Sequence, residues 1–429
     1  MISGIRESGQ LHTWHAIAND AVRLARSFSE LRGQLVAVEG ESEAELACRV
    51  LAALHAGAIP VLGNNIASVA ERIGLKSLPK VKATISDYEM RESLKIDEDA
   101  EVAFCTSGSA GPGKVIRKTM SQLLREVEFW QRHFSIDADS SIISLVSMRH
   151  IYGHLFGFLL AYRSQATLHV VRPFSAELQM DRDVTGRTSN NLIVSVPSTW
   201  SLARLLFTEA DSFHFVTSGA AFGNERSVQL SKWVSENQDR LLSAIEVLGS
   251  TETGGYGMRH LLSDERGFRL IPNSSLQLDG DAPILNSPFL SAPVPLDDKI
   301  VSVGEGVYKW MGRRDRVIKF GAKRFSLDEF EQNIREVVGQ NGTNVRCFYL
   351  ADEAAAHGGE LVAFVGPTSW TESELRVALS QNPHLPVPQK LFVLENWPDG
   401  QTGKIGFDNL ITFSRRSVGT FLNNEVPHV

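Results

Sequence analysis

The chain has 429 residues, 43% of them hydrophobic and 22% charged, which indicates a globular protein long enough for two domains. A net charge of -7 and a sequence without a clustered basic run argue against a non-specific nucleic-acid binder. The first residues show no apolar signal-peptide core, and no apolar stretch approaches the roughly 20 residues of a membrane-spanning helix, so a cytoplasmic location is expected.

The three cysteines give no sign of a disulfide framework or a zinc site. Cys48, Cys105 and Cys347 are odd in number, widely separated and without C-x-x-C spacing. We therefore expect them to be reduced and mostly buried thiols.

The first predicted elements form a βαβ unit. Apolar residues at helical spacing predict a helix over 20–31, and the apolar run at 35–38 predicts a buried strand. Ser42 and Glu45 have the spacing of a capping box at the start of a second helix, which is followed by an apolar strand at 58–62. A strand, a helix and a second strand in this order are typical of an α/β domain.

The next stretch, FCTSGSAGPGKVIRK at 104–118, has the composition of a phosphate-binding loop. Its glycines let backbone N–H groups approach an anion, its hydroxyl residues can donate to phosphate oxygens, and Lys114 supplies a positive charge. Nucleotide binding is therefore the first functional hypothesis.

Three interpretations of this loop are open at this point. Residues 108–114 fit the G-x-x-x-x-G-K pattern of a P-loop kinase or other NTPase, but Val115 stands where that pattern needs a hydroxyl for magnesium. The second interpretation is an ordinary glycine-rich turn between a strand and a helix. The third is a nucleotide loop of another family, which only the segments farther along the chain can identify.

Helix and strand patterns alternate after the loop. Helices are expected near 119–134, 152–163 and 225–238 and from 199 onward, and strands from Ile142 and over 166–171, 192–196, 213–219 and 244–250. This alternation predicts an α/β fold with mostly parallel sheets that helices cover, and with ligands bound at the carboxyl ends of the strands.

Three segments with polar residues and glycines follow predicted strands. They are MRHIYGHLFG at 148–157, the tripeptide Ser218-Gly219-Ala220 and VLGSTETGG at 247–255. In the first, His150 lies close in sequence to the aromatic residues Tyr152 and Phe156. A histidine near aromatic residues is also common in hydrophobic cores, so His150 does not identify a site by itself.

The last third of the chain predicts a compact α+β unit of about 100 residues, a size that can form a domain. Asp298 precedes this unit, and the unit begins within the stretch GRRDRVIKFGAKRFSLDEFE at 312–331. The segment PDGQTGKI at 398–405 lies near its end and contains Lys404.

These segments, in this order, resemble motifs of the AMP-forming adenylate synthetases, which include acyl-CoA synthetases, aryl-acid ligases and peptide-synthetase adenylation domains. TSGSAG with Lys114 is similar to T-S-G-S-T-G-x-P-K-G, with Ala110, Gly113 and Val115 replacing Thr, Pro and Gly. Residues 248–252 are similar to Y-G-x-T-E, with Leu248 replacing the aromatic residue.

The resemblance implies roles for the matching residues of the large domain. Contacts to phosphate and nucleotide are implied for Thr106, Ser107, Gly108, Ser109, Gly111, Lys114, Ser218, Gly219, Ala220, Gly249 and Ser250. Thr251 would contact the α-phosphate, and Glu252 would hold Mg2+. His150 would be a pocket gate along the path of the acid's carboxylate, and Tyr152 and Phe156 would form part of the pocket wall.

The C-terminal segments carry the most specific part of the resemblance. Asp298 and Arg313 have the spacing of the family's ribose-binding Asp and of the Arg that contacts ribose or phosphate, and a carboxylate can accept both hydrogen bonds of a ribose diol. Asp315 would be the hinge. PDGQTGKI is similar to L-P-x-T-x-x-G-K-I, with Trp397 replacing Leu, so Lys404 would bridge the acid's carboxylate and the α-phosphate.

The resemblance also implies domains and an activity. An adenylation core at 1–311 and a small mobile lid at 317–429 would be joined by a hinge at 312–316. With ATP and Mg2+, the enzyme would convert a carboxylic acid into an acyl-adenylate and pyrophosphate. It would then transfer the acyl group to the thiol of CoA or of a phosphopantetheinylated acyl carrier protein.

The substrate class follows from a narrower resemblance. The short chain and its KRFSLDEFE stretch are similar to the small ligases of aryl-polyene and xanthomonadin pathways, which implies an aryl acid, such as a hydroxybenzoate, or a medium-length acyl acid. Besides a P-loop kinase, a catalytically silent nucleotide-binding relative is the alternative.

Overall fold

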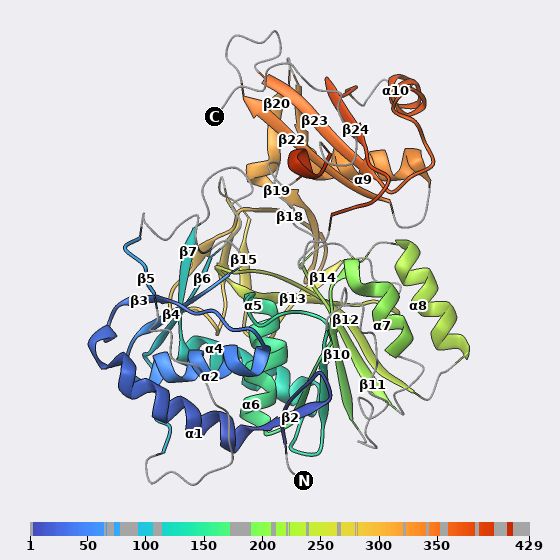
Figure 1. Cartoon of the computed structure of the whole chain (residues 1–429). Helices are drawn as coiled ribbons and strands as arrows, with labels where there is room; N and C mark the ends of the chain where they lie inside the picture. The colour runs from blue at the N-terminus through green and yellow to red at the C-terminus, as the bar shows by residue number, and fades with distance from the viewer. Residues whose placement is uncertain are drawn as a thin grey trace.

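The computed structural model describes residues 3–63, 66, 73–77, 93–105, 114–171, 190–206, 212–219, 222, 224–236, 240–263, 267–278, 280, 282–320, 323–339, 343–351, 359–381, 386–398 and 410–414. Figure 1 shows a large lower part, which the first three quarters of the chain form, and a smaller upper part that the C-terminal strands and helices form.

The N-terminal elements contain the predicted βαβ unit. After a hairpin of β1 (Gly4–Glu7) and β2 (Gln10–Thr13) come α1 (Trp14–Ala25), a 3-10 helix (Arg26–Leu31), β3 (Leu35–Ala37), α2 (Glu43–His55) and β4 (Ile59–Leu62). β3 and β4 pair in parallel, which confirms the prediction. The Ser42 hydroxyl accepts the Glu45 N–H at 3.1 Å, so it caps α2 as expected.

β3 and β4 belong to a five-stranded sheet with the order β5-β3-β4-β6-β7. Its other members are β5 (Lys76–Ser77), β6 (Glu101–Cys105) and β7 (Val115–Thr119). β6 and β7 are antiparallel, and Cys105 pairs with Val115. The predicted phosphate loop therefore connects the two strands of a hairpin.

The second sheet has eleven strands in the order β18-β19-β14-β13-β12-β11-β10-β8-β9-β1-β2. The new strands are β8 (Ser141–Ser144), β9 (Thr167–Val170), β10 (Asn191–Ser195), β11 (Phe213–Thr217), β12 (Leu241–Ser250), β13 (Gly254–His260), β14 (Phe268–Leu270), β18 (Asp298–Gly304) and β19 (Val307–Arg313). The run β1-β9-β8-β10-β11-β12 is parallel. A separate small sheet contains β15 (Ser275–Gln277), β16 (Ile284–Asn286) and β17 (Val294–Pro295).

Helices cover both faces of the parallel strands (Figure 1). They are α4 (Met120–His133), α5 (Ile151–Gly153), a π-helical segment (His154–Leu159), α6 (Leu160–Ser164), a 3-10 turn (Pro197–Thr199), α7 (Trp200–Leu206) and α8 (Asn224–Glu236). In β10, Leu192 and Val194 join the core beneath α4 and α6, whereas Ile193 joins the core beneath α7 and α8. Successive side chains of a strand point to opposite faces, so one buried strand serves both cores. The predicted α/β fold class is confirmed.

The C-terminal part has its own hydrophobic core. It contains β20 (Val317–Phe320), β21 (Lys323–Ser326), α9 (Leu327–Val338), β22 (Asn344–Ala351), β23 (Gly359–Gly366), α10 (Glu372–Ser380) and β24 (Lys390–Val393). A 3-10 turn, Arg314–Arg316, connects it to β19, the strand that precedes it in the large sheet. The domain boundaries predicted from the sequence stay a prediction.

Two expectations from composition can be compared with the structure. Cys48 and Cys347 are buried and Cys105 is half-buried, and none of the three forms a disulfide bond, as predicted. Within the described ranges, we find no helix whose length and apolar character would suffice to cross a bilayer.

Replacing His154 by leucine is expected to make the folded state less sensitive to acid. His154 is fully buried between the rings of Phe104 and Phe158, with both centroid distances at 5.3 Å. Burial lowers the pKa of His154 from 6.5 to about 4. As the pH falls through this range, the unfolded chain binds a proton at His154 before the folded chain does, so stability is lost.

Between about pH 7 and about pH 4.5, the wild type should therefore lose about 2 kcal/mol more unfolding free energy than His154→Leu. Urea unfolding at both pH values measures this difference. Phe158→Leu is the matched control, because it removes a buried neighbour and no titratable group. A His154→Leu effect that is equal at both pH values would contradict the expected result.

Candidate functional site

The structure brings several predicted site residues to one edge of the large sheet. β8, β11 and β12 belong to its parallel run, so their carboxyl ends lie at the same edge. His150 comes shortly after β8, Ser218 and Gly219 directly follow β11, and Thr251 and Glu252 directly follow β12. Open α/β sheets bind their ligands at such an edge.

Part of the predicted site lies outside the described residues. This applies to Thr106, Ser107, Gly108, Ser109, Gly111, Ala220 and Lys404, and to the substituted positions Ala110 and Gly113. Lys114 is described: it is exposed and directly precedes β7.

The hairpin around the predicted phosphate loop argues against the P-loop alternative. A P-loop connects a strand to a helix, and the N-terminus of that helix faces the phosphates. Here Lys114 is followed by β7, which pairs antiparallel with β6, and α4 begins only at Met120. The segment therefore lacks the strand-loop-helix geometry of a P-loop kinase.

The segment at 251–253 forms a tight turn between the antiparallel strands β12 and β13, which we call the acidic turn. Ser250 and Thr253 exchange hydrogen bonds, from the Ser250 N–H to Thr253 Oγ1 at 3.0 Å and from the Thr253 N–H to Ser250 Oγ at 3.3 Å. A Cβ at Gly249 would lie 2.3 Å from the Gly254 carbonyl oxygen, so the close approach of the strands requires glycine. Thr251 and Glu252 are half-buried at the tip.

Two buried charged residues that the sequence analysis did not select hold this turn. Lys118 Nζ donates a hydrogen bond to the Glu252 carbonyl, and Glu126 Oε1 accepts the Gly255 N–H at 2.8 Å. Burial lowers the pKa of Lys118 and raises the pKa of Glu126 to about 7. In the sequence, Glu126 is a charged residue at a position of the apolar helical face that contains Leu123, Val127 and Trp130, whereas Lys118 has no such signal.

The turn after β11 is also tied to β12. The Ser218 hydroxyl donates to the Val247 carbonyl at 2.9 Å, and Gly219 has a φ of +86°, in the left-handed region that favours glycine. Glu246 accepts the Phe222 N–H at 3.1 Å and pairs with Arg259 at 2.5 Å. These contacts fix the position of Ser218 and Gly219 relative to the acidic turn.

The segment that leads to His150 is held by a buried carboxylate. Glu43 in α2 accepts the Ser147 hydroxyl at 2.6 Å and the Met148 N–H at 3.0 Å. His150 itself is half-buried and precedes α5. This support positions the His150 backbone at the sheet edge.

The two aromatic residues predicted as pocket wall beside His150 have structural contacts. The Tyr152 hydroxyl donates to the Val216 carbonyl at 3.0 Å. Phe156 is 2% exposed and packs with its ring centroid 5.0 Å from that of Trp130. Phe156 is therefore packed in the hydrophobic core, and the role of both residues as pocket wall stays a prediction.

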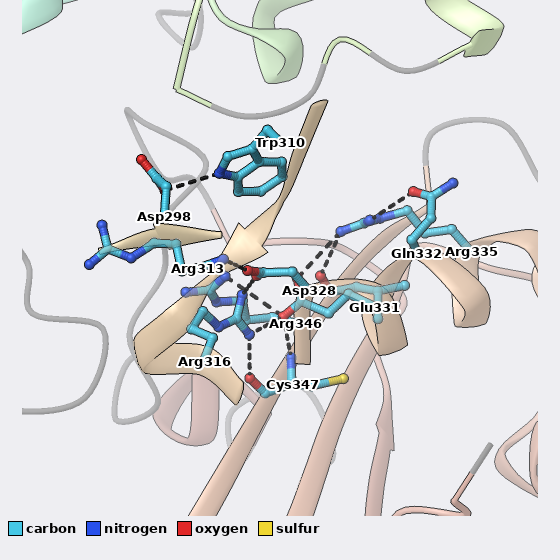
Figure 2. A network of polar contacts seen from close by, with 11 residues as sticks. Asp298, Trp310, Arg313, Arg316, Asp328, Glu331, Gln332, Arg335, Arg346 and Cys347 are labelled. Carbon is cyan, nitrogen blue, oxygen red and sulfur yellow. Dashed lines mark hydrogen bonds and ion pairs between the residues drawn. The ribbon is translucent and has the colours of Figure 1, made fainter. Parts of the chain in front are cut away.

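Asp298 begins β18 and lies in a buried polar position (Figure 2). Its two carboxylate oxygens accept hydrogen bonds from Trp310 Nε1 at 3.0 Å and from the Tyr256 hydroxyl at 3.2 Å. The neighbouring Asp297 is instead exposed and lies 3.4 Å from the Arg313 guanidinium. Asp298 and Arg313 are register partners on adjacent strands, so these two residues lie directly opposite each other in the sheet although 15 positions separate them along the chain.

A buried network links the predicted hinge to the C-terminal part (Figure 2). The Arg316 guanidinium binds the carboxylates of Asp328 and Glu331 and donates to the Cys347 carbonyl at 2.9 Å. Burial would lower the pKa of Arg316, but these carboxylates raise it overall. Asp328 also accepts the Arg313 N–H at 2.9 Å, so one carboxylate contacts the chain on both sides of the turn that contains Asp315.

Comparisons with known proteins agree with this arrangement. The model of the family described as AMP-binding enzyme matches residues 76–275. A 4-coumarate–CoA ligase of Halorhodospira halophila is 26% identical over 225 residues, which are 52% of this chain and 54% of that protein. The matched part thus spans about half the length of this curated relative.

Solved structures match over almost the whole chain. ATP-bound MatB from Rhodopseudomonas palustris has a TM-score of 0.71 at 15% identity, over 97% of this chain and 96% of that one. The o-succinylbenzoate CoA synthetase MenE from Bacillus subtilis, in complex with AMP, has a TM-score of 0.71 at 14% identity, over 99% and 96%. At these identities the likeness shows a common fold.

Proposed function

Because this chain belongs to the AMP-forming adenylate synthetase superfamily, we propose that it activates a carboxylic acid with ATP and transfers the acyl group to a thiol. The observation that carries the proposal is the meeting of two motifs from different sheets. The strand that leaves the predicted phosphate loop contacts the acidic turn through the hydrogen bond from Lys118 to the Glu252 carbonyl. This contact joins the motif proposed for the phosphates to the motif proposed for Mg2+.

In the first half-reaction, a carboxylate oxygen of the acid attacks the α-phosphorus of ATP, and the bond to pyrophosphate breaks. We assign the departing phosphates to Lys114 and the hydroxyls of Thr106, Ser107 and Ser109, and the α-phosphate to Thr251. The developing negative charge would be neutralised by cations placed before the reaction begins, which lowers the barrier without reorganisation.

Mg2+ enters this scheme as part of the nucleotide substrate. The described residues contain no group of three or more His, Cys, Asp and Glu that could hold a metal ion. Mg2+ in nucleotide sites is commonly held by one or two carboxylates together with substrate phosphates. The single Glu252 carboxylate at the tip of the acidic turn fits that donor set.

In the second half-reaction, a thiol attacks the acyl carbonyl and AMP leaves. We propose that the unit at 317–429 turns about Asp315 between the two steps, withdrawing Lys404 and admitting the thiol. The acceptor is CoA or the phosphopantetheine of a carrier protein, and the acid is aryl or medium-chain acyl. The matched 4-coumarate–CoA ligase favours CoA and an aryl acid. The proposal keeps the predicted cytoplasmic location.

Asp298→Asn is expected to weaken binding of ATP and AMP roughly tenfold to a hundredfold, because hydrogen bonds to a charged group contribute about 1.5 to 3 kcal/mol. The amide can still accept from Trp310 and donate to the Tyr256 hydroxyl, so folding should persist. Isothermal titration with AMP measures the effect.

Asp297→Asn is the matched control for this substitution. Asp297 is half-exposed and its contact with Arg313 is long, at 3.4 Å, so removing its charge should change nucleotide affinity little. If Asp297→Asn weakened AMP binding and Asp298→Asn did not, the ribose role would belong to Asp297.

Product analysis tests the proposed reaction. The protein is incubated with MgATP, CoA and one acid at a time. Nucleotides and thioesters are then separated by chromatography and identified by mass spectrometry. We expect AMP, pyrophosphate and an acyl thioester with at least one aryl or medium-chain acid. A phosphopantetheinylated carrier protein replaces CoA in a parallel series. Formation of ADP and a phosphorylated acid would contradict the proposal.

A further inference from the structure

Lys118 lies in an unusual position for a lysine. It is the fourth residue of β7 and is 5% exposed, although its neighbour Arg117 reaches solvent and pairs with Glu101. Removing an ammonium group from water is unfavourable unless polar groups replace the lost hydration. Here the Glu252 carbonyl oxygen accepts a hydrogen bond from the Lys118 ammonium group. The nearby carboxylates of Glu126 and Glu252 also stabilise its positive charge.

Glu126 has a complementary position on α4. It is 2% exposed, and its Oε1 accepts the Gly255 N–H at 2.8 Å and Trp130 Nε1 at 3.3 Å. Gly254 has a φ of +69°, and a Cβ at that residue would lie 2.1 Å from Glu126 Oε2. The close approach of this carboxylate therefore requires glycine in the strand that leaves the acidic turn.

The two contacts hold the acidic turn at its tip and at the start of the strand that leaves it. Lys118 holds the carbonyl of Glu252, and Glu126 holds the N–H of Gly255. Both residues come from one short segment, since α4 starts directly after β7. That segment also follows directly on the predicted phosphate loop, whereas Glu252 lies 134 residues from Lys118 along the chain.

We propose that Lys118 and Glu126 are positioning residues that fix the acidic turn relative to β7 and α4, the two elements that follow the predicted phosphate loop along the chain. This inference rests on the proposed function, in which Glu252 meets Mg2+ on phosphates that the loop holds. Mg2+ demands nearly ideal octahedral geometry and short metal–oxygen distances, so a small shift of the Glu252 peptide misplaces the carboxylate. The metal-dependent step is therefore the one that depends on Lys118.

The test compares Lys118→Met, which keeps a long stem and removes the ammonium, with Arg117→Met on the same strand. In Lys118→Met we expect pyrophosphate exchange to fall tenfold to a hundredfold, and the half-saturating Mg2+ concentration to rise at least severalfold, because the loss of a buried charged contact misaligns the group that it holds. The KM for the acid should change less than about twofold, since that site is not moved. Arg117→Met should match the wild type.

Calorimetry supplies a readout that does not depend on turnover. Lys118→Met should bind MgATP more weakly than the wild type does, whereas its affinity for AMP without metal should be unchanged. A purely structural lysine would lower the melting temperature and leave both the Mg2+ dependence and the MgATP affinity as in the wild type. That result would overturn the proposal.

A second variant keeps the test valid if Lys118→Met does not fold. Lys118→Met with Glu126→Gln removes both buried charges and retains an acceptor for the Gly255 N–H. It should fold and show the same increase in Mg2+ requirement. If the wild type exchanges pyrophosphate and both variants match it, the positioning role fails while the proposed function stands. If the wild type shows no exchange with any acid, the proposed function fails, and MgATP calorimetry still tests Lys118.

Discussion

Lys404→Ala is expected to lower acyl-adenylate formation by roughly a hundredfold to a thousandfold, the usual effect of removing one group that stabilises transition-state charge. In the proposed reaction, its ammonium bridges the acid's carboxylate and the α-phosphate while charge moves to pyrophosphate. Thioester formation from supplied acyl-adenylate should continue at nearly the wild-type rate, because the proposed domain rotation has removed Lys404 from the site by then. Single-turnover assays of each half-reaction measure the two rates.

Lys390→Ala is the control for this substitution. Lys390 is a half-exposed lysine of the same C-terminal part and pairs with Glu360 at 2.7 Å, so its removal should leave both half-reactions unchanged. If Lys404→Ala slowed both half-reactions equally, the two steps would share one arrangement of the domains, and the rotation about Asp315 would be refuted.

Arg316→Met is expected to destabilise the C-terminal part by about 3 to 5 kcal/mol, the usual cost of leaving buried charges without their partner. The guanidinium is 7% exposed and neutralises Asp328 and Glu331, whose side chains are 17% and 6% exposed. Methionine preserves much of the volume and none of the hydrogen bonds. Urea unfolding followed by the fluorescence of Trp370 and Trp397 reports the loss.

Arg335→Met tests whether burial is the cause of that loss. Arg335 also pairs with Glu331, but at 3.6 Å and with 39% of its side chain exposed. Its removal should cost less than about 1 kcal/mol, as for other solvent-screened pairs. Equal losses in the two variants would mean that the network in Figure 2 does not derive its strength from burial.

The elements that the sequence predicted well have local signals. The helix expected over 119–134 is α4 at Met120–His133, because Thr119 and Gln122 form a capping box in which each side chain binds the other's backbone N–H. The buried strands 192–196 and 213–219 were likewise identified from short apolar runs. Their parallel order followed from the alternation with helices.

β7 was missed because its signal is not local. VIRKT follows a glycine-rich loop and has no clear alternation, and it becomes a strand by pairing with β6. Tertiary pairing of this kind overrides weak intrinsic propensity. The consequence for function is large, because this strand separates the loop from α4 and places Lys118 against the acidic turn.

The spacing between Asp298 and Arg313 in the sequence predicted that these two residues belong to one site. The 15 residues from Asp298 to Arg313 fit the family pattern, and the structure pairs these residues on adjacent strands. Tyr256 and Trp310 donate hydrogen bonds to Asp298. Chain spacing could not identify these two donors, because neither belongs to a motif. Buried polar groups need such partners, but the sequence does not say which element supplies them.

Acid-dependent exchange of labelled pyrophosphate into ATP, run across aryl acids and fatty acids, tests whether this protein forms an acyl-adenylate. We expect Mg2+-dependent exchange with at least one of these acids and none without acid, since pyrophosphate can re-form ATP only from an enzyme-bound acyl-adenylate. Absence of exchange with every acid, in protein that binds MgATP, would contradict the assignment of this chain as an acid-adenylating enzyme.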